Sequence, residues 1–332
     1  MLTAKENFLE TLKKDGRPDR LVNQYQPFVP IMNDPLQRYT RGNRVRGTTS
    51  IDKWGTEILF PEDAPGPMPH VTNENKVCPD ITRWKEYVKI PDLAANCSQG
   101  WEDALASAAA VDRSEKLVMG FMGTGVFEQC HFLMGFEDTL MNFLLEPEAM
   151  HELVDAVAEY RFQYAKLLVD NLKPDVILSH DDWGSKRSLF MQPDTWREFF
   201  KDHYKRIYGY MKDHGVIVIH HADSFCEPIV EDMVDIGIDV WQGVLPENDI
   251  VKLQKQLDGR MTLMGGIDAT IDRKDSTEEE IRADVRRACS TYGPGGHYIP
   301  CMTYGLAGTI YPKTDEVIAD EIDRYNKETY GV

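Results

Sequence analysis

The chain of 332 residues carries 55 acidic and 37 basic side chains, which give it a formal net charge of −18. A field of that sign repels nucleic acid and anionic membrane surfaces, so we expect neither as a partner. Hydrophobic residues make up 42% of the chain, and no stretch approaches roughly 18 uninterrupted apolar residues. The composition is therefore that of a globular protein without a membrane span.

Two further features of the sequence indicate the compartment. The six cysteines are scattered without the close spacing of a disulfide framework, so we expect reduced thiols. The first residues contain no apolar run followed by a cleavage site. We therefore expect a cytoplasmic protein.

The N-terminal quarter shows the weakest pattern of regular structure. A strand is possible at residues 21–25, but residues 27–91 are rich in Pro, Gly and Asn and predict an irregular excursion. Such an excursion is either an active-site cover or a mobile surface segment. Four arginines lie within it: Arg38, Arg41, Arg44 and Arg46. They could clamp an anion, although the charge pattern favours a solvated loop face.

From residue 116 onward, short apolar runs alternate with amphipathic ones, which is typical of βα units that build a parallel sheet. The apolar runs predict strands at residues 116–121, 176–179, 216–219, 240–244, 261–264 and 298–301. The amphipathic runs predict helices at residues 147–171, 193–212, 227–236, 249–257 and 277–292. We expect an α/β fold, a single (β/α)8 TIM barrel over residues 1–332, because roughly seven or eight such units close a barrel. The alternative is an open doubly wound sheet. No GxGxxG or P-loop pattern follows a predicted strand, so the sequence does not support nucleotide binding.

Polar side chains follow several of the predicted strands, and in a barrel these strand ends meet at one rim. A His and an Asp two residues apart point roughly the same way, and a thiolate from another strand could complete a zinc site. His221, Asp223 and Cys301 are the first choice of ligands, with His220 and Cys226 as substitutes. The alternative is a hydrogen-bonded core histidine and a core cysteine.

Carboxylates at two other strand ends are also candidates. Asp181 and Asp182 are adjacent, so one faces the barrel axis and the other the surrounding helices. The inward carboxylate, beside Trp183, could act as a general base or hold a substrate, although turn chemistry is an equal alternative. Glu128 could reach the same rim, with His131 three residues on, although a first-turn acid beside a packed imidazole is the commoner arrangement.

Several motifs resemble the uroporphyrinogen decarboxylase superfamily from about Val118 onward. The matching segments are residues 181–185, 192–199, 123–135 and 237–268, the last with its Pro-Glu-Asn-Asp and Gly-Gly-Ile-Asp sequences. The resemblance implies a single (β/α)8 barrel. The superfamily includes decarboxylases of a porphyrinogen and methyltransferases that exchange methyl groups with a corrinoid protein. Residues 23–28 lack the Arg-Gln-Ala-Gly-Arg motif by which the decarboxylases bind carboxylates, so decarboxylation is the second choice.

The methyltransferase branch carries a His-x-Cys motif and a later Cys that together bind zinc. The family spacing places the His on His221, the first Cys on Asp223 and the second near Cys301, although the segment at 302–312 is longer than expected. A carboxylate in place of a thiolate leaves a harder metal, suited to an oxygen or nitrogen ligand.

We therefore expect a zinc-dependent methyltransferase that moves a methyl group between a small methoxylated or N-methylated compound and a corrinoid carried by a partner protein. In this hypothesis Asp182 and Glu128 orient the substrate, Asp182 being the catalytic candidate. Trp183 and Tyr304 form the apolar wall of the substrate site. A uroporphyrinogen decarboxylase and a barrel that only binds a small molecule are the alternatives.

Overall fold

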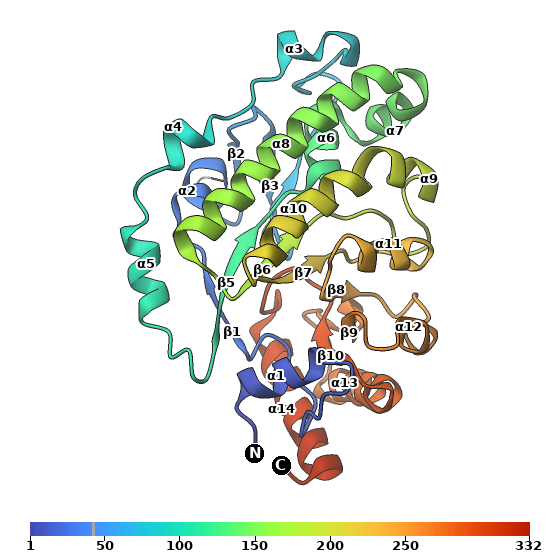
Figure 1. The fold of residues 1–332 in the computed structure, drawn as a ribbon. Coiled ribbons are helices and arrows are strands. Elements are labelled where there is room, and N and C mark those ends of the chain that lie inside the picture. Colours follow the sequence, from blue (N-terminus) through green and yellow to red (C-terminus); the bar gives the residue numbers. More distant parts are fainter. Residues whose placement is uncertain (42–43) are drawn as a thin grey trace.

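A parallel sheet that curls into a barrel forms the centre of the computed structural model, which describes residues 1–41 and 44–332 (Figure 1). Its strands, in spatial order, are β1 (Phe28–Ile31), β5 (Leu117–Met122), β6 (Val176–His180), β7 (Ile217–His221), β8 (Val240–Val244), β9 (Thr262–Ile267) and β10 (Tyr298–Met302). The spatial order equals the chain order, whereas a doubly wound sheet reverses its order at a switch point. The fold is therefore the expected α/β, TIM-like barrel, although the sheet in the described residues has seven parallel strands where the (β/α)8 pattern has eight.

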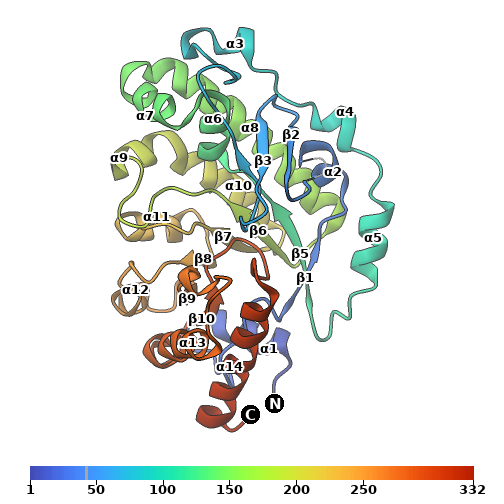
Figure 2. The same cartoon turned by 180° about the vertical axis from the view of Figure 1, so that it is seen from behind.

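Helices surround this sheet and connect its strands (Figures 1 and 2). Their bounds are α1 (Ala4–Leu12), α2 (Pro35–Arg41), α3 (Trp84–Tyr87), α4 (Leu93–Cys97), α5 (Glu102–Ala109), α6 (Val126–Met134), α7 (Phe136–Leu145), α8 (Pro147–Leu172), α9 (Pro193–Trp196), α10 (Asp202–Asp213), α11 (Val230–Asp235), α12 (Ile250–Leu257), α13 (Glu278–Tyr292) and α14 (Pro312–Tyr330). The predicted helix at residues 193–212 is present but contains a π-helical turn at Arg197–Lys201. None of the described helices combines the length and apolarity needed to cross a membrane.

The strand considered at residues 21–25 is not formed. Gln24 adopts a left-handed backbone conformation with φ +47°, which is incompatible with an extended strand. Its backbone N–H still donates to the Pro300 carbonyl (3.3 Å), and its side-chain oxygen accepts from the Met302 N–H (3.2 Å). This segment therefore lies against β10, beyond the seven strands, and the first strand begins at Phe28.

The barrel is filled by inward-facing apolar side chains of the strands. Leu178, Ile219 and Met264 belong to this inner cluster together with Phe8 of α1. The Phe8 ring meets Phe28 edge-on, with a centroid distance of 4.9 Å. Because these side chains occupy the interior, the barrel is a packed core, and space for a ligand is found above the strand ends.

The excursion at residues 27–91 contains a second, antiparallel sheet of three strands: β2 (Thr48–Ile51), β3 (Glu57–Phe60) and β4 (Met68–Pro69) (Figure 2). The turn between β3 and β4 brings residues 65–69 to the wall of the cavity described below. Of the two interpretations of the excursion, this arrangement agrees with a cover over the site.

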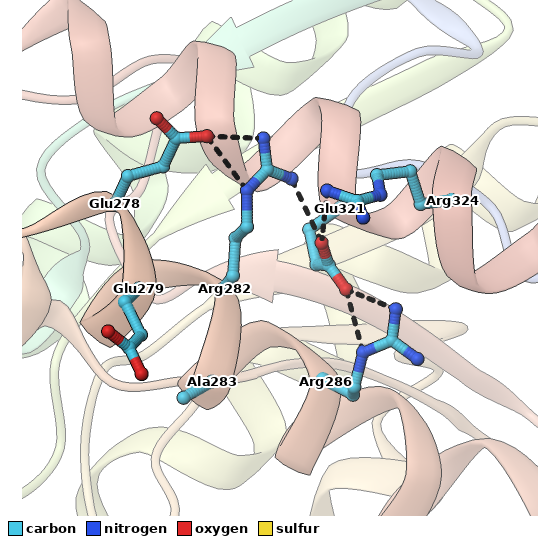
Figure 3. A pocket seen from close by; sticks show the side chains of 7 residues that line it. All are labelled: Glu278, Glu279, Arg282, Ala283, Arg286, Glu321 and Arg324. Atoms are coloured by element: carbon cyan, nitrogen blue, oxygen red, sulfur yellow. Dashed lines mark hydrogen bonds and ion pairs between the residues drawn. The ribbon is translucent and has the colours of Figure 1, made fainter.

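Helices α13 and α14 are joined by a network of arginines and acids (Figure 3). The buried carboxylate of Glu321 accepts from Arg282 (2.9 Å) and from Arg286 (2.8 Å). Arg282 also donates to Glu278, and Arg286 to Glu328. The arginines that line the hollow at this network are already paired with acids of the chain, so we assign it a structural role.

Candidate metal and substrate site

A cavity of about 560 Å³ lies above the carboxyl ends of β5, β6 and β7. Its polar lining includes Arg41, Arg44, Arg46, Glu128, His131, His180, Asp182, His221 and Asp223. The segment at 304–309 after β10 and residues 65–69 of the excursion complete the wall. In α/β barrels the residues that do chemistry are found at this end of the strands.

His180 is the last residue of β6, and its ring is held by Glu128 of α6. The Nδ1–H group donates to Glu128 Oε2 at 2.9 Å. Burial lowers the pKa of His180, but the negative charge and hydrogen bond of Glu128 outweigh burial and raise the pKa to about 9. Since Nδ1 carries the hydrogen, Nε2 is the nitrogen that can offer a lone pair when the ring is neutral.

His221 ends β7 and is oriented by Gln242 of β8. The buried Gln242 amide nitrogen donates to the carbonyls of Met302 (3.1 Å) and Tyr304 (2.9 Å), which leaves its oxygen to accept from His221 Nδ1 at 2.5 Å. Burial, followed by the charge of His180, lowers the pKa of His221 well below its usual value. His221 is therefore neutral, with its Nε2 lone pair free toward the cavity.

His180, Asp182 and His221 form a group in which one ligand atom of each lies within 4.8 Å of the others. The two imidazole rings are stacked at a centroid distance of 4.4 Å, and His221 Nε2 lies 3.9 Å from Asp182 Oδ1. Burial, followed by the charge of Asp223, raises the pKa of Asp182 well above its usual value. Two imidazoles and one carboxylate, each histidine held through Nδ1, form a donor set that fits zinc and leaves a position for substrate.

The expected ligand set of His221, Asp223 and Cys301 is not brought together. Asp223 lines the cavity outside this group, and its backbone N–H donates to Asp182 Oδ1 (3.0 Å). Cys301 points into the apolar barrel interior, where burial raises the pKa of its thiol. The register explains the error, because Cys301 lies within β10 beside Gly266, whereas the chain reaches the cavity only from Tyr304 onward.

The substitutes His220 and Cys226 do not reach the cavity either. Successive residues of a strand point to opposite faces, so His220 faces the helices when His221 faces the cavity. Its ring stacks on Trp183 at a centroid distance of 4.0 Å and shares a hydrogen bond with the Tyr208 hydroxyl (2.7 Å). Cys226 is fully buried in the surrounding core.

The side chains of the adjacent residues Asp181 and Asp182 point in opposite directions, as the sequence predicted. Asp181 is buried and accepts from the N–H groups of Phe127 and Glu128, in the first turn of α6, and from the indole of Trp183. Asp181 therefore positions Glu128, while Asp182 faces the cavity. The expectation that Trp183 forms the substrate wall is wrong, since Trp183 is fully buried behind the site. Glu128 and Tyr304 do line it.

Three of the four arginines of the excursion line the cavity. Arg41 and Arg44 are partly buried there, which contradicts the solvated loop face that the sequence favoured, whereas Arg38 and Arg46 are exposed and agree with it. The Arg41 guanidinium lies over the Phe121 ring at 4.7 Å. Arg46 donates to the Ala64 carbonyl (2.7 Å). Arg38 lies outside the lining and pairs with Asp103.

Sequence reasoning did not select His180 or Gln242 for the site. A signal for both is present, because each is polar within a run that reads as a buried strand. His180 directly follows the predicted strand at 176–179, and Gln242 is the polar residue in the middle of β8. A buried polar residue on a strand needs a partner, and here each one finds it at the cavity.

A profile described as "Uroporphyrinogen decarboxylase (URO-D)" matches residues 48–325. The chain belongs to this family. It is 22% identical over 317 residues to a uroporphyrinogen decarboxylase of Cupriavidus metallidurans, covering 89% of this chain and 80% of that one. It is 26% identical over 178 residues to the uroporphyrinogen decarboxylase of Chlorobium phaeobacteroides, covering 51% of this chain but only 46% of that one. The chain thus spans about half the length of this relative.

A solved structure extends the likeness over the whole fold. A methyltransferase from Methanosarcina mazei superposes with a TM-score of 0.68 at 17% identity, covering 98% of this chain and 99% of the other. At this identity the likeness establishes the shared barrel.

Proposed function

We propose that this chain is a metal-dependent methyltransferase that moves a methyl group between a small methoxylated or N-methylated compound and a corrinoid carried by a partner protein. The observation that carries the proposal is the group His180, Asp182 and His221 at the base of a cavity of small-molecule size. The likeness of the whole barrel to the Methanosarcina mazei methyltransferase supports it.

Zinc held by His180, Asp182 and His221 would supply a Lewis acid for the heteroatom that carries the methyl group. The other residues position and shield this chemistry. Glu128 and Gln242 fix the two imidazoles, and Asp223 and Tyr304 line the space beside them. Residues 65–69 cover the cavity and limit the entry of water.

The transfer balances as a nucleophilic displacement at the methyl carbon. The bond between carbon and heteroatom would break, and the methyl carbon would pass to the reduced corrinoid of the partner protein, which would supply the electron pair of the new bond. The heteroatom keeps the pair of the broken bond and takes up a proton. The site would contribute by stabilising the charge that develops on this heteroatom.

Metal analysis of protein purified without chelator tests the proposal. We expect about one zinc per chain, with metal lost in His180→Ala and His221→Ala, because each removes one ligand of a three-ligand site. Cys301→Ser is the matched control and should keep its zinc. Methyl transfer to reduced cobalamin, followed by absorbance with methoxylated and N-methylated compounds, should fall with the metal. Full metal content in both alanine variants would contradict the assignment.

Decarboxylation of a porphyrinogen is the second candidate. It is favoured by Arg41, Arg44 and Arg46 in the cavity wall, since guanidinium groups bind carboxylates. Turnover of uroporphyrinogen by metal-free protein would support it. Absence of both activities, with retained binding of small molecules, would favour a barrel that only binds.

A further inference from the structure

Two guanidinium groups of the cavity wall have polar atoms without a partner. Arg41 Nη1 and Arg44 Nε are inaccessible to solvent and make no hydrogen bond within the described part of the chain. Buried polar groups in native proteins are nearly always satisfied, and a buried charge is paired or neutralised. Both side chains line the same cavity, so a ligand bound there would lie beside them.

The positive charges of these two arginines repel each other. Burial, and next the positive charge of Arg44, lower the pKa of Arg41 to about 9. Burial likewise lowers the pKa of Arg44. Glu128 attracts both guanidiniums and Asp52 attracts Arg44, but neither acid outweighs the cost of burying the two like charges in the free protein. An anion placed between them would remove both the repulsion and the unsatisfied donors.

The position of Arg41 is fixed by its neighbours. Its guanidinium stacks on Phe121, the fifth residue of β5, and lies against Gly123. A Cβ atom at Gly123 would come within 2.9 Å of Arg41 Nη1, so a side chain there would displace the guanidinium. Arg41 is therefore held above β5, whereas His180 and His221 end β6 and β7.

We propose that Arg41 and Arg44 bind a carboxylate of the methyl-bearing substrate, whose methylated heteroatom lies at His180, Asp182 and His221. The substrate class is then a methoxylated or N-methylated carboxylic acid. Phe132, Phe136 and Phe190 line the same cavity and suit the apolar body of such a molecule. The fork of each guanidinium matches the two oxygens of a carboxylate. The placement of the methylated heteroatom rests on the proposed function. The binding of a carboxylate by Arg41 and Arg44 does not depend on that function.

Calorimetric titration of the full chain with acid and amide pairs tests the carboxylate half. The probes are 4-methoxybenzoate and N,N-dimethylglycine, each compared with its primary amide. We expect at least one acid to bind about tenfold or more tightly than its amide, because charge-assisted hydrogen bonds are the stronger kind. This preference should weaken as salt is added.

Variants assign the preference to the two arginines. Arg41→Gln and Arg44→Gln should each reduce the preference for the acid over its amide to about threefold or less. Arg38→Gln, one turn earlier on α2 and paired with Asp103 outside the cavity, is the matched control and should keep the full preference. Thermal unfolding of each variant separates loss of the site from loss of the fold.

The outcomes separate this inference from the proposed function. Acid preference lost in the Arg41 and Arg44 variants supports the carboxylate site even if no methyl group moves. Equal binding of acid and amide for every probe overturns it, and so does a preference that survives both substitutions. Methyl transfer that uses amides as well as acids would overturn it while leaving the proposed methyltransferase intact.

Discussion

Two groups of arginines show how differently the same side chain is used in this protein. Arg282 and Arg286, between α13 and α14, are joined to Glu278, Glu321 and Glu328. Hydrogen bonds to these acids raise the pKa of both guanidiniums. Arg41 and Arg44 in the cavity have buried nitrogen atoms without a partner, and their pKa values are lowered.

The contrast distinguishes a structural network from a binding site. Between α13 and α14 every guanidinium meets a carboxylate of the chain, so the charges are compensated in the free protein (Figure 3). At the cavity the carboxylates Glu128 and Asp182 lie at the histidines. At the arginine end, Glu128 and Asp52 offset the charge only in part, and the buried donors of Arg41 and Arg44 stay without a partner that a ligand can supply.

The largest expected effect concerns the histidine and aspartate group itself. Asp182→Asn keeps the side-chain shape but removes the anionic ligand, so methyl transfer should fall by about 10³-fold, equal to several kcal/mol of lost stabilisation. Asp232→Asn is the matched control, since Asp232 pairs with Arg197 and Lys201 away from the cavity and should leave turnover unchanged. If Asp182→Asn lowered only the free energy of unfolding, the group would be another structural network.

The next effect concerns the network between α13 and α14. Glu321→Gln should lower the free energy of unfolding by about 2 kcal/mol, measured by urea denaturation, because it removes a buried acid from two arginines. The cost is moderate because those arginines are partly exposed and can be solvated. Glu328→Gln, at an exposed position, should have no measurable effect. A fall in methyl transfer by the folded Glu321 variant would contradict the division of roles.

The sequence predicted the barrel well because strand and helix patterns are local. The strands from residue 116 onward were found with ends shifted by at most three residues, and His221 was correctly expected at a strand end facing the cavity. The early strand failed because the left-handed Gln24 has no sequence signature as clear as a glycine.

The partners within the site could not be predicted, because they depend on how separate strand ends meet in space. Cys301 and Asp223 were grouped with His221 by spacing, whereas the register of β10 keeps Cys301 in the core. The arginines looked like a solvated loop, because sequence does not show that the excursion folds back over the barrel. Alternation did separate Asp181 from Asp182, but it could not say which of them faced inward.

A third expected effect tests whether Gln242 organises the histidine and aspartate group for a metal. Gln242→Met removes the acceptor that holds His221 Nδ1, so zinc affinity should fall by about 10- to 100-fold in a competition titration with a chelator. Gln254→Met is the matched control, because Gln254 also donates to two backbone carbonyls, those of Tyr292 and Gly296, but lies outside the cavity lining. Equal affinity in both variants would mean that Gln242 has only a packing role.

The smallest expected effect applies one substitution to both arginine groups. Arg41→Met keeps most of the apolar stem over Phe121 and removes a buried charge that lacks a hydrogen-bonded acid, so the ligand-free protein should be unchanged or more stable by up to about 1 kcal/mol. Arg286→Met removes a partner of the buried Glu321 and should destabilise the protein. Urea denaturation without ligand measures both. Changes of opposite sign in the free energy of unfolding would show that the cavity arginines are kept at the expense of stability, which is the property of a binding site. Equal destabilisation by both substitutions would contradict that interpretation.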